Sequence, residues 1–176
     1  MRYIFRPFTL FVAVSLFGTL FGCAAVVVRS KPGTTTTVIL TRHADRDEGD
    51  DNLNAKGHER VKALVDAVSD MGVTAIYSPN VERNLATVRP LASRLGIEIT
   101  RTPAISVFAA GSIVNEILEK HAGGVVLWVG NISGNLQVMY HLLGGTGTGP
   151  VEYGDLYILT IPDDGPVKVV KRRYGP

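Results

Sequence analysis

The chain has 176 residues, which is enough for one compact domain with a hydrophobic core but not comfortably for two. Its 18 basic and 16 acidic residues give no strong net charge, which argues against nucleic acid or a polybasic membrane contact. The single cysteine, Cys23, excludes an intrachain disulfide and argues against a zinc cluster or a thiol nucleophile in the folded domain.

The first residues have the pattern of an export signal. Arg2 and Arg6 precede an apolar stretch at 8–21, shorter than the about 20 residues that a membrane span needs. The stretch ends at Gly22-Cys23, which resembles a bacterial lipobox, where the cysteine is lipidated and becomes the new N-terminus. An uncleaved anchor and an ordinary signal peptide, with Cys23 incidental, are the alternatives.

These features divide the chain into three parts. We expect a lipoprotein signal peptide over 1–22, a lipid-anchored tether over 23–35 and a folded domain over 36–176. Removal of the signal leaves 16 basic against 16 acidic residues, so the mature protein is close to neutral. The predicted location is the bacterial cell envelope, lipid-anchored on the periplasmic face or the cell surface.

The folded domain begins with the apolar run Val38-Ile39-Leu40, which predicts a buried strand ending at Arg42-His43. The segment 46–52 carries four acidic residues around a glycine. Without a spaced ligand pattern it predicts a mobile, solvated loop rather than a metal site.

The remaining segments alternate between helical spacing and short apolar runs. One expected helix ends at Met71, and three others span 81–95, 112–121 and 134–143, with a break or bend at Pro90. The expected strands after the first span 73–78, 97–100, 125–129, 156–161 and 167–173. This alternation predicts an α/β fold, a three-layer α/β/α sandwich around a mainly parallel sheet. The last two strands should form its antiparallel edge.

Three strands of this predicted sheet end in polar side chains. Arg42 and His43 follow the first strand, Arg83 follows the second and Asn131 follows the central one. For Arg42-His43 alone, surface charge at a strand end is the alternative. Ligands collect at the carboxyl ends of strands in open α/β sheets, and guanidinium groups match phosphate geometry. These four residues therefore predict a phosphate site, with phosphoryl transfer as the reaction class.

Five segments, in order, strengthen this interpretation. They are 40–45 with Arg42-His43, 53–57 with the helix after it, 76–87 with Ser78, Arg83 and Thr87, 126–144, and 153–156. They resemble the motifs of the histidine phosphatase superfamily, also called phosphoglycerate-mutase-like, with Ala44 where glycine is usual.

The resemblance implies a two-step reaction without metal or other cofactor. His43 would be the nucleophile, with one ring nitrogen held by a backbone carbonyl, and would form a phosphohistidine that water hydrolyses. Arg42 and Arg83 would bind the phosphoryl group. Asp45 is expected to be an orienting partner rather than an acid.

The chain departs from the family at two places. Asn131 stands where the family has a second histidine, and an amide carries neither positive charge nor an exchangeable catalytic proton. We do not expect the other histidines, His58, His121 and His141, to replace it. No carboxylate occupies the family's leaving-group positions at Ile132 or within 105–108, and Glu116 is expected to be a solvated helix residue.

Three functions stay open on this basis. The first is a phosphatase for phosphomonoesters or phosphoramidates, of ordinary or weak activity, that works through a phosphohistidine at His43. The second is a non-catalytic phosphate-binding envelope lipoprotein, a pseudoenzyme, and the third is a structural lipoprotein. The expected partners are a small phosphorylated substrate or phosphate ion and, through Cys23, the membrane.

Overall fold

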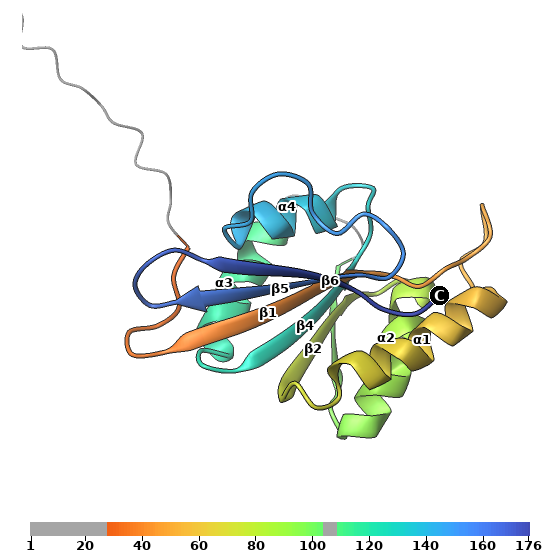
Figure 1. Cartoon of the computed structure of the whole chain (residues 1–176), viewed down its shortest axis with the longest axis horizontal. Helices are drawn as coiled ribbons and strands as arrows, with labels where there is room; N and C mark the ends of the chain where they lie inside the picture. Colours follow the sequence, from red (N-terminus) through yellow and green to blue (C-terminus); the bar gives the residue numbers. More distant parts are fainter. Residues whose placement is uncertain (1–27, 104–108) are drawn as a thin grey trace, which may run out of the picture.

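A single mixed sheet runs through the computed structural model of the protein (Figure 1). The structure describes residues 28–103 and 109–176, and over these residues the sheet has six strands and is covered by four helices. The elements are β1 (Thr35–Arg42), α1 (Ala55–Val68), β2 (Val73–Pro79), α2 (Glu82–Leu95), β3 (Ile99–Thr102), α3 (Ala110–Lys120), β4 (Val125–Gly130), α4 (Asn135–Leu142), β5 (Asp155–Pro162) and β6 (Lys168–Arg173).

The strand order is β3-β2-β4-β1-β5-β6. The first four strands in this order pair in parallel, whereas β5 is antiparallel to both β1 and β6. The predicted α/β class, with a mainly parallel sheet and an antiparallel edge, is confirmed. The register of β1 on β4 places Arg42 beside Gly130, so the chain leaves these two strands at the same point.

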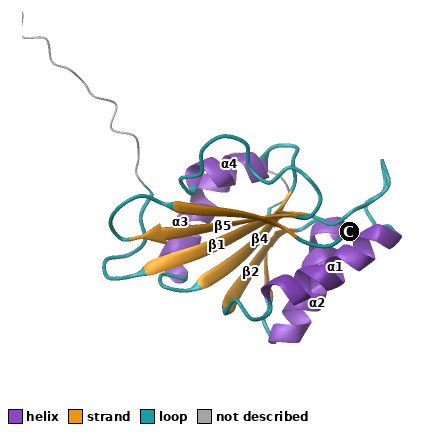
Figure 2. Ribbon diagram, viewed as in Figure 1, coloured by secondary structure: helices purple, strands orange, loops and turns teal. Residues whose placement is uncertain are grey.

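Helices lie on both faces of the sheet (Figure 2). Helices α1 and α2 cover one face, where Leu64 and Leu91 are fully buried, and α3 and α4 cover the other, where Ile117 and Met139 are fully buried. Each such side chain contributes about 1.5–3 kcal/mol. The continuous apolar run of β4 follows from its central place, since both its faces are covered.

Helix α2 continues through Pro90, so of the predicted break or bend the break is wrong, and the bend stays a prediction. An interior proline costs a helix about 3 kcal/mol because it lacks an N–H group. Pro90 lies on the exposed side, while Val88 and Leu91 beside it are completely buried. Burial of this apolar face offsets the cost.

Strand β3 begins two residues later than the predicted strand at 97–100. Gly96 ends α2 in the left-handed conformation, with φ 65°, and the Ile97 N–H donates to the Ala92 carbonyl at 3.0 Å. These residues therefore close the helix before the strand can start. The other predicted elements are present, with ends that differ by a few residues.

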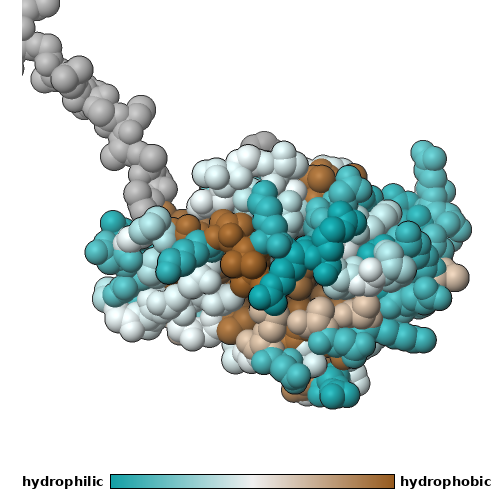
Figure 3. Space-filling model, in the orientation of Figure 1, coloured by the Kyte–Doolittle hydropathy of each residue, from teal (hydrophilic) through white to brown (hydrophobic). Residues whose placement is uncertain are grey.

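The face in Figure 3 is mostly polar, with apolar patches at its upper edge, in its middle and at its lower edge. Within 28–103 and 109–176, no helix combines the length and apolar character needed to cross a membrane. The expected signal peptide at 1–22 and the expected lipid site at Cys23 lie outside the described residues.

A buried ion pair joins α1 to the loop after β1. Arg60 and Asp45 are 2% and 5% exposed, and the guanidinium holds the carboxylate through Nε and Nη2. Arg60 also donates from Nη1 to the Tyr174 carbonyl at 2.8 Å. Gly154 makes this possible, because a Cβ there would lie 2.3 Å from Nη1. The pair thus fixes the C-terminal segment and the chain just beyond His43.

Replacing Arg60 by Met should lower the free energy of unfolding by about 3–5 kcal/mol, because Asp45 would be left buried without its partner. Urea denaturation of the purified full chain in mild detergent measures this. The matched control is Arg89→Met, which breaks an exposed pair with Glu82 and should cost less than about 1 kcal/mol. Similar losses in the two variants would contradict a structural role for the buried pair.

Candidate functional site

The predicted site residues meet at the carboxyl ends of three adjacent strands. Arg42 ends β1 and His43 follows it, Asn131 follows β4, and Arg83 lies in the first turn of the helix after β2. The His43 backbone N–H donates to the Gly130 carbonyl at 3.1 Å, which extends the β1–β4 pairing by one residue. His43 and Asn131 are therefore held close together by the backbone itself.

His43 is held as one particular tautomer. Its side chain is almost wholly buried, with the residue 3% exposed, and its Nδ1 lies 2.8 Å from the Ala44 carbonyl oxygen. A carbonyl can only accept a hydrogen bond, so Nδ1 carries the proton of the neutral ring and Nε2 carries the lone pair. This is the arrangement that a nucleophilic imidazole needs.

Burial, more than any other cause, lowers the pKa of His43 from its ordinary value to about 4. The Ala44 carbonyl opposes the shift, and the positive charges of Arg42 and Arg83 add to it. His43 is consequently neutral at physiological pH, even though two guanidinium groups lie near it.

Arg42 is fixed by the segment that leads into β5. Its Nη1 donates to the Val151 carbonyl at 3.0 Å, and its guanidinium lies 3.7 Å from the centre of the Tyr153 ring. The same ring meets His43 edge to face, with 5.7 Å between ring centres. A buried carboxylate, Asp155, holds this segment by accepting the N–H groups of Val151 and Glu152 at 3.1 and 2.9 Å.

Arg83 and Asn131 are bonded to each other. The Arg83 Nε donates to the Asn131 Oδ1 at 2.9 Å, and the Asn131 Nδ2 donates to the Asn84 Oδ1 at 3.0 Å. Because an arginine can only donate, these bonds fix the orientation of the Asn131 amide. Its backbone N–H donates to the Asn135 Oδ1 at 2.9 Å, which ties the start of α4 to the site.

One hydroxyl connects the two halves of the site. The Thr87 Oγ1 accepts the Ala44 backbone N–H at 2.9 Å and donates to the Arg83 carbonyl at 2.7 Å. It therefore sets the position of the loop after β1 relative to α2.

Two buried donors at the site have no acceptor within the described residues: Arg42 Nε and Asn84 Nδ2. Buried N–H groups are normally satisfied, and an unsatisfied one calls for an explanation. Arg42 is itself a predicted phosphate ligand, and Asn84 accepts a hydrogen bond from another one, Asn131. Unpaired donors beside two cationic side chains suit an anion with several acceptor oxygens.

The acidic loop at 46–52 is solvated as expected, since residues 47–52 are exposed, but one of its carboxylates also bonds to the site. The Asp51 carboxylate forms an ion pair with Arg83 through Nη1, and its Oδ2 accepts the Glu82 backbone N–H at 3.2 Å. Sequence alone gave no signal for this contact, because several carboxylates in a short loop are equivalent until its conformation is known.

Asp45 does not orient His43 directly. Its carboxylate is taken up by Arg60, with the Lys56 ammonium 3.9 Å away, and the His43 ring is held by a backbone carbonyl instead. Asp45 thus stabilises the loop that follows the nucleophile position.

The other candidate residues lie elsewhere. His121 and Glu116 both contact the Tyr77 hydroxyl, at 3.0 and 3.2 Å. Glu116 lies on α3, as expected, with its side chain 35% exposed, and it also pairs with Lys120. His141 contacts Gln137 and the Gly145 carbonyl. His58 is exposed on α1. The segment 105–108 lies outside the described residues.

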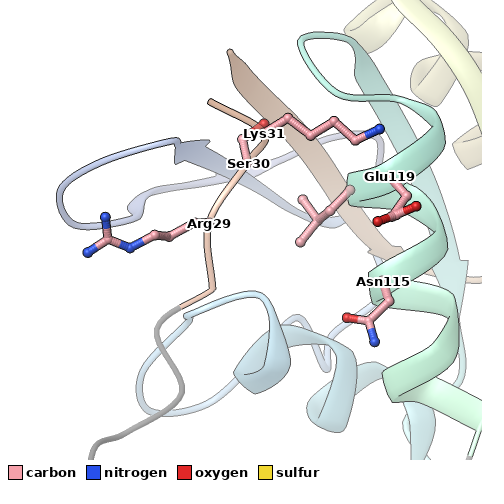
Figure 4. Close-up of a pocket in the computed structure, with 6 residues that line it drawn as sticks. Arg29, Ser30, Lys31, Asn115 and Glu119 are labelled. Atoms are coloured by element: carbon pink, nitrogen blue, oxygen red, sulfur yellow. The ribbon is translucent and has the colours of Figure 1, made fainter. Parts of the chain in front are cut away.

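The described residues show no metal cluster at the site, and the hollow between the N-terminal segment and α3 lies away from it. Within the part of the chain that the structure describes, no three His, Cys, Asp or Glu side chains are grouped to hold a metal ion. A hollow of about 320 Å³ lies between the N-terminal segment and α3 (Figure 4), and it is lined by Arg29, Ser30, Lys31, Asn115, Leu118 and Glu119. None of these is a predicted site residue.

The fold is that of known phosphatases. The chain superimposes on the protein histidine phosphatase SixA in complex with tungstate with a TM-score of 0.60 and 12% identity, over 78% of this chain and 96% of SixA. It also resembles YhfR of Bacillus stearothermophilus (TM-score 0.60, 19% identity, 77% and 95% covered). A third neighbour is a mycobacterial glucosyl-3-phosphoglycerate phosphatase with bound VO3 (0.59, 13%, 79% and 98%).

The sequence itself matches the histidine phosphatase superfamily (branch 1) over residues 38–114. No curated protein sequence matches the chain significantly. The family match covers less than half of the chain, and the structural neighbours, all below 25% identity, share its fold. The matched region contains His43 and Arg83, whereas Asn131 lies beyond it.

The low pKa of His43 predicts a specific loss of stability in acid. The unfolded chain binds a proton on His43 near pH 6.5 and the folded protein only near pH 4, so stability is fully present above pH 6.5. It should fall by about 3 kcal/mol between pH 7 and 4. Urea denaturation of His43→Gln, which lacks this site, should show a correspondingly smaller fall. His58→Gln, changed on an exposed helix face, should behave like wild type, and equal falls in all three proteins would contradict the prediction.

Proposed function

We propose that the protein is a metal-independent phosphatase that works by transient phosphorylation of His43. One observation carries the proposal: a buried, neutral histidine, with its proton fixed on Nδ1, lies near two arginines at the carboxyl edge of the sheet in a histidine-phosphatase fold. Two structural neighbours form complexes with oxyanions, SixA with tungstate and the mycobacterial phosphatase with VO3, which supports an oxyanion site in this fold.

In the first step, the Nε2 lone pair attacks phosphorus, and the bond from phosphorus to the leaving oxygen or nitrogen breaks. Arg42 and Arg83 neutralise the equatorial oxygens, which is the main demand of phosphoryl transfer. In the second step, water attacks the phosphohistidine, and His43 and inorganic phosphate are released.

The proposed substrate class follows from which groups at the site can supply positive charge or a proton. An amide can donate a hydrogen bond to a phosphoryl oxygen but cannot add charge. The Glu116 carboxylate is engaged by Lys120 and Tyr77, and no carboxylate bonds to His43 within the described residues. Leaving groups that need no proton from a protein acid are thus favoured. These are aryl phosphates among the monoesters, whose aryl oxide leaves as an anion, and phosphoramidates, whose basic nitrogen can take its proton from water.

The cellular context is part of the same proposal and depends on sequence alone. A signal peptide at 1–22 and lipidation of Cys23 would tether the domain to the bacterial cell envelope. The substrate would then be extracytoplasmic and small.

Turnover of an aryl phosphate by the purified full chain tests the catalytic proposal. Wild type should release phosphate and become phosphorylated on His43, and His43→Ala should do neither. Tungstate binding measured by calorimetry should weaken by about 10- to 100-fold in Arg42→Gln, since a charge-assisted bond is lost. Arg89→Gln, an exposed arginine on α2, is the matched control. Binding without turnover would instead favour the second candidate, a non-catalytic phosphate-binding protein, which Asn131 motivates.

Replacing Asn131 by His should raise aryl phosphate turnover by about 10- to 100-fold. An imidazole at this position can donate to the Asn84 Oδ1 as the amide does, and on protonation it adds charge beside the phosphoryl group. Asn131→Gln, which keeps the amide, controls for repacking. Equal turnover in the two variants would show that this position does not limit the rate.

A further inference from the structure

A carboxylate already occupies part of the proposed phosphate site. The Asp51 side chain bonds to the Arg83 guanidinium with one oxygen and accepts the Glu82 N–H at the start of α2 with the other, at 3.2 Å. A guanidinium and a free backbone N–H in the first turn of a helix form a donor set that also binds phosphate oxygens. Asp51 therefore uses donors that a phosphoryl group would use.

The loop that carries Asp51 is held in place independently of Arg83. The Asp50 carboxylate accepts the Asn52 backbone N–H at 2.9 Å, and the Arg46 Nη1 donates to the Asp50 carbonyl at 2.7 Å. The Asn54 amide donates to the Asp47 carboxylate at 2.9 Å. The carboxylate is thus presented to Arg83 by a folded loop rather than by a freely moving chain.

The contact is also easy to break. The Asp51 side chain is 48% exposed, whereas that of Arg83 is only 16% exposed. The Asp51 side chain can turn outward into solvent while Arg83 keeps its hydrogen bond to Asn131. Solvent access weakens an ion pair, and the Asp51 carboxylate is open to solvent, so a ligand with more charge and more acceptor oxygens can displace it.

From this geometry we propose that Asp51 is an internal anionic competitor that sets the affinity of the site for phosphate. In the free protein it neutralises Arg83, and a phosphoryl group must displace it to reach the guanidinium. This inference rests on the proposed function, because it assumes that Arg83 binds the phosphoryl group. Asp51 is an affinity-determining residue rather than a catalytic one.

Calorimetric titration of the full chain with tungstate tests the proposal. Asp51→Asn should bind tungstate about three- to tenfold more tightly than wild type, and Asp51→Ser should show the same gain. Glu48→Gln removes one negative charge from the same loop, at a side chain with no hydrogen bond within the described residues, and should bind like wild type. The gain should disappear when Arg83→Gln is added to Asp51→Asn.

Unchanged or weaker binding by both Asp51 variants would overturn the proposal. An equal gain in Glu48→Gln would do so too, because it would show a general charge effect of the loop. These outcomes are separate from the catalytic proposal. A gain in tungstate affinity without aryl phosphate turnover supports the competitor role and rejects the phosphatase, whereas turnover with unchanged affinity does the reverse.

Discussion

The site depends first on the parallel pairing of β1 with β4. Arg42 lies opposite Gly130 in the register, and the next backbone hydrogen bond joins His43 to Gly130. A side chain at position 130 is excluded, because its Cβ would lie 2.9 Å from both Leu136 and the Trp128 indole nitrogen. The separation of His43 and Asn131 is consequently fixed by backbone bonds and close packing, not by the flexible ends of side chains.

The charges at the site are arranged so that a neutral ring survives among cations. Burial and the neighbouring guanidinium groups act together to keep the proton off His43 Nε2, while the Ala44 carbonyl keeps one on Nδ1. The proposed nucleophile and the proposed anion site therefore have one common electrostatic cause. Each arginine is itself held by oxygen acceptors, Arg42 by Val151 and Arg83 by Asn131.

Sequence reasoning predicted the parts of the protein that follow from local pattern and strand direction. Apolar runs predict the strands, and the rule that parallel strands end at one edge of a sheet predicts that Arg42, Arg83 and Asn131 lie together. The contacts of Asp51 and Tyr153 could not be predicted, because they depend on loop conformations with no periodic signal. The role of Asp45 was also misjudged, since its partner Arg60 is fifteen residues away and is recognised only when α1 is docked.

Val151 and Tyr153, which contact Arg42, lie in the segment that leads into the antiparallel strand β5. The proposed chemistry, by contrast, belongs to the ends of the parallel strands. The lead-in to β5 joins the site through Arg42 and the edge of His43, and it is anchored on its own carboxylate, Asp155. The connection between α4 and β5 can thus change in length or composition while the pairing of β1 with β4 is kept. The proposed phosphoryl transfer therefore depends on the ends of the parallel strands, while the segment beside Arg42 belongs to a separately anchored piece of the fold.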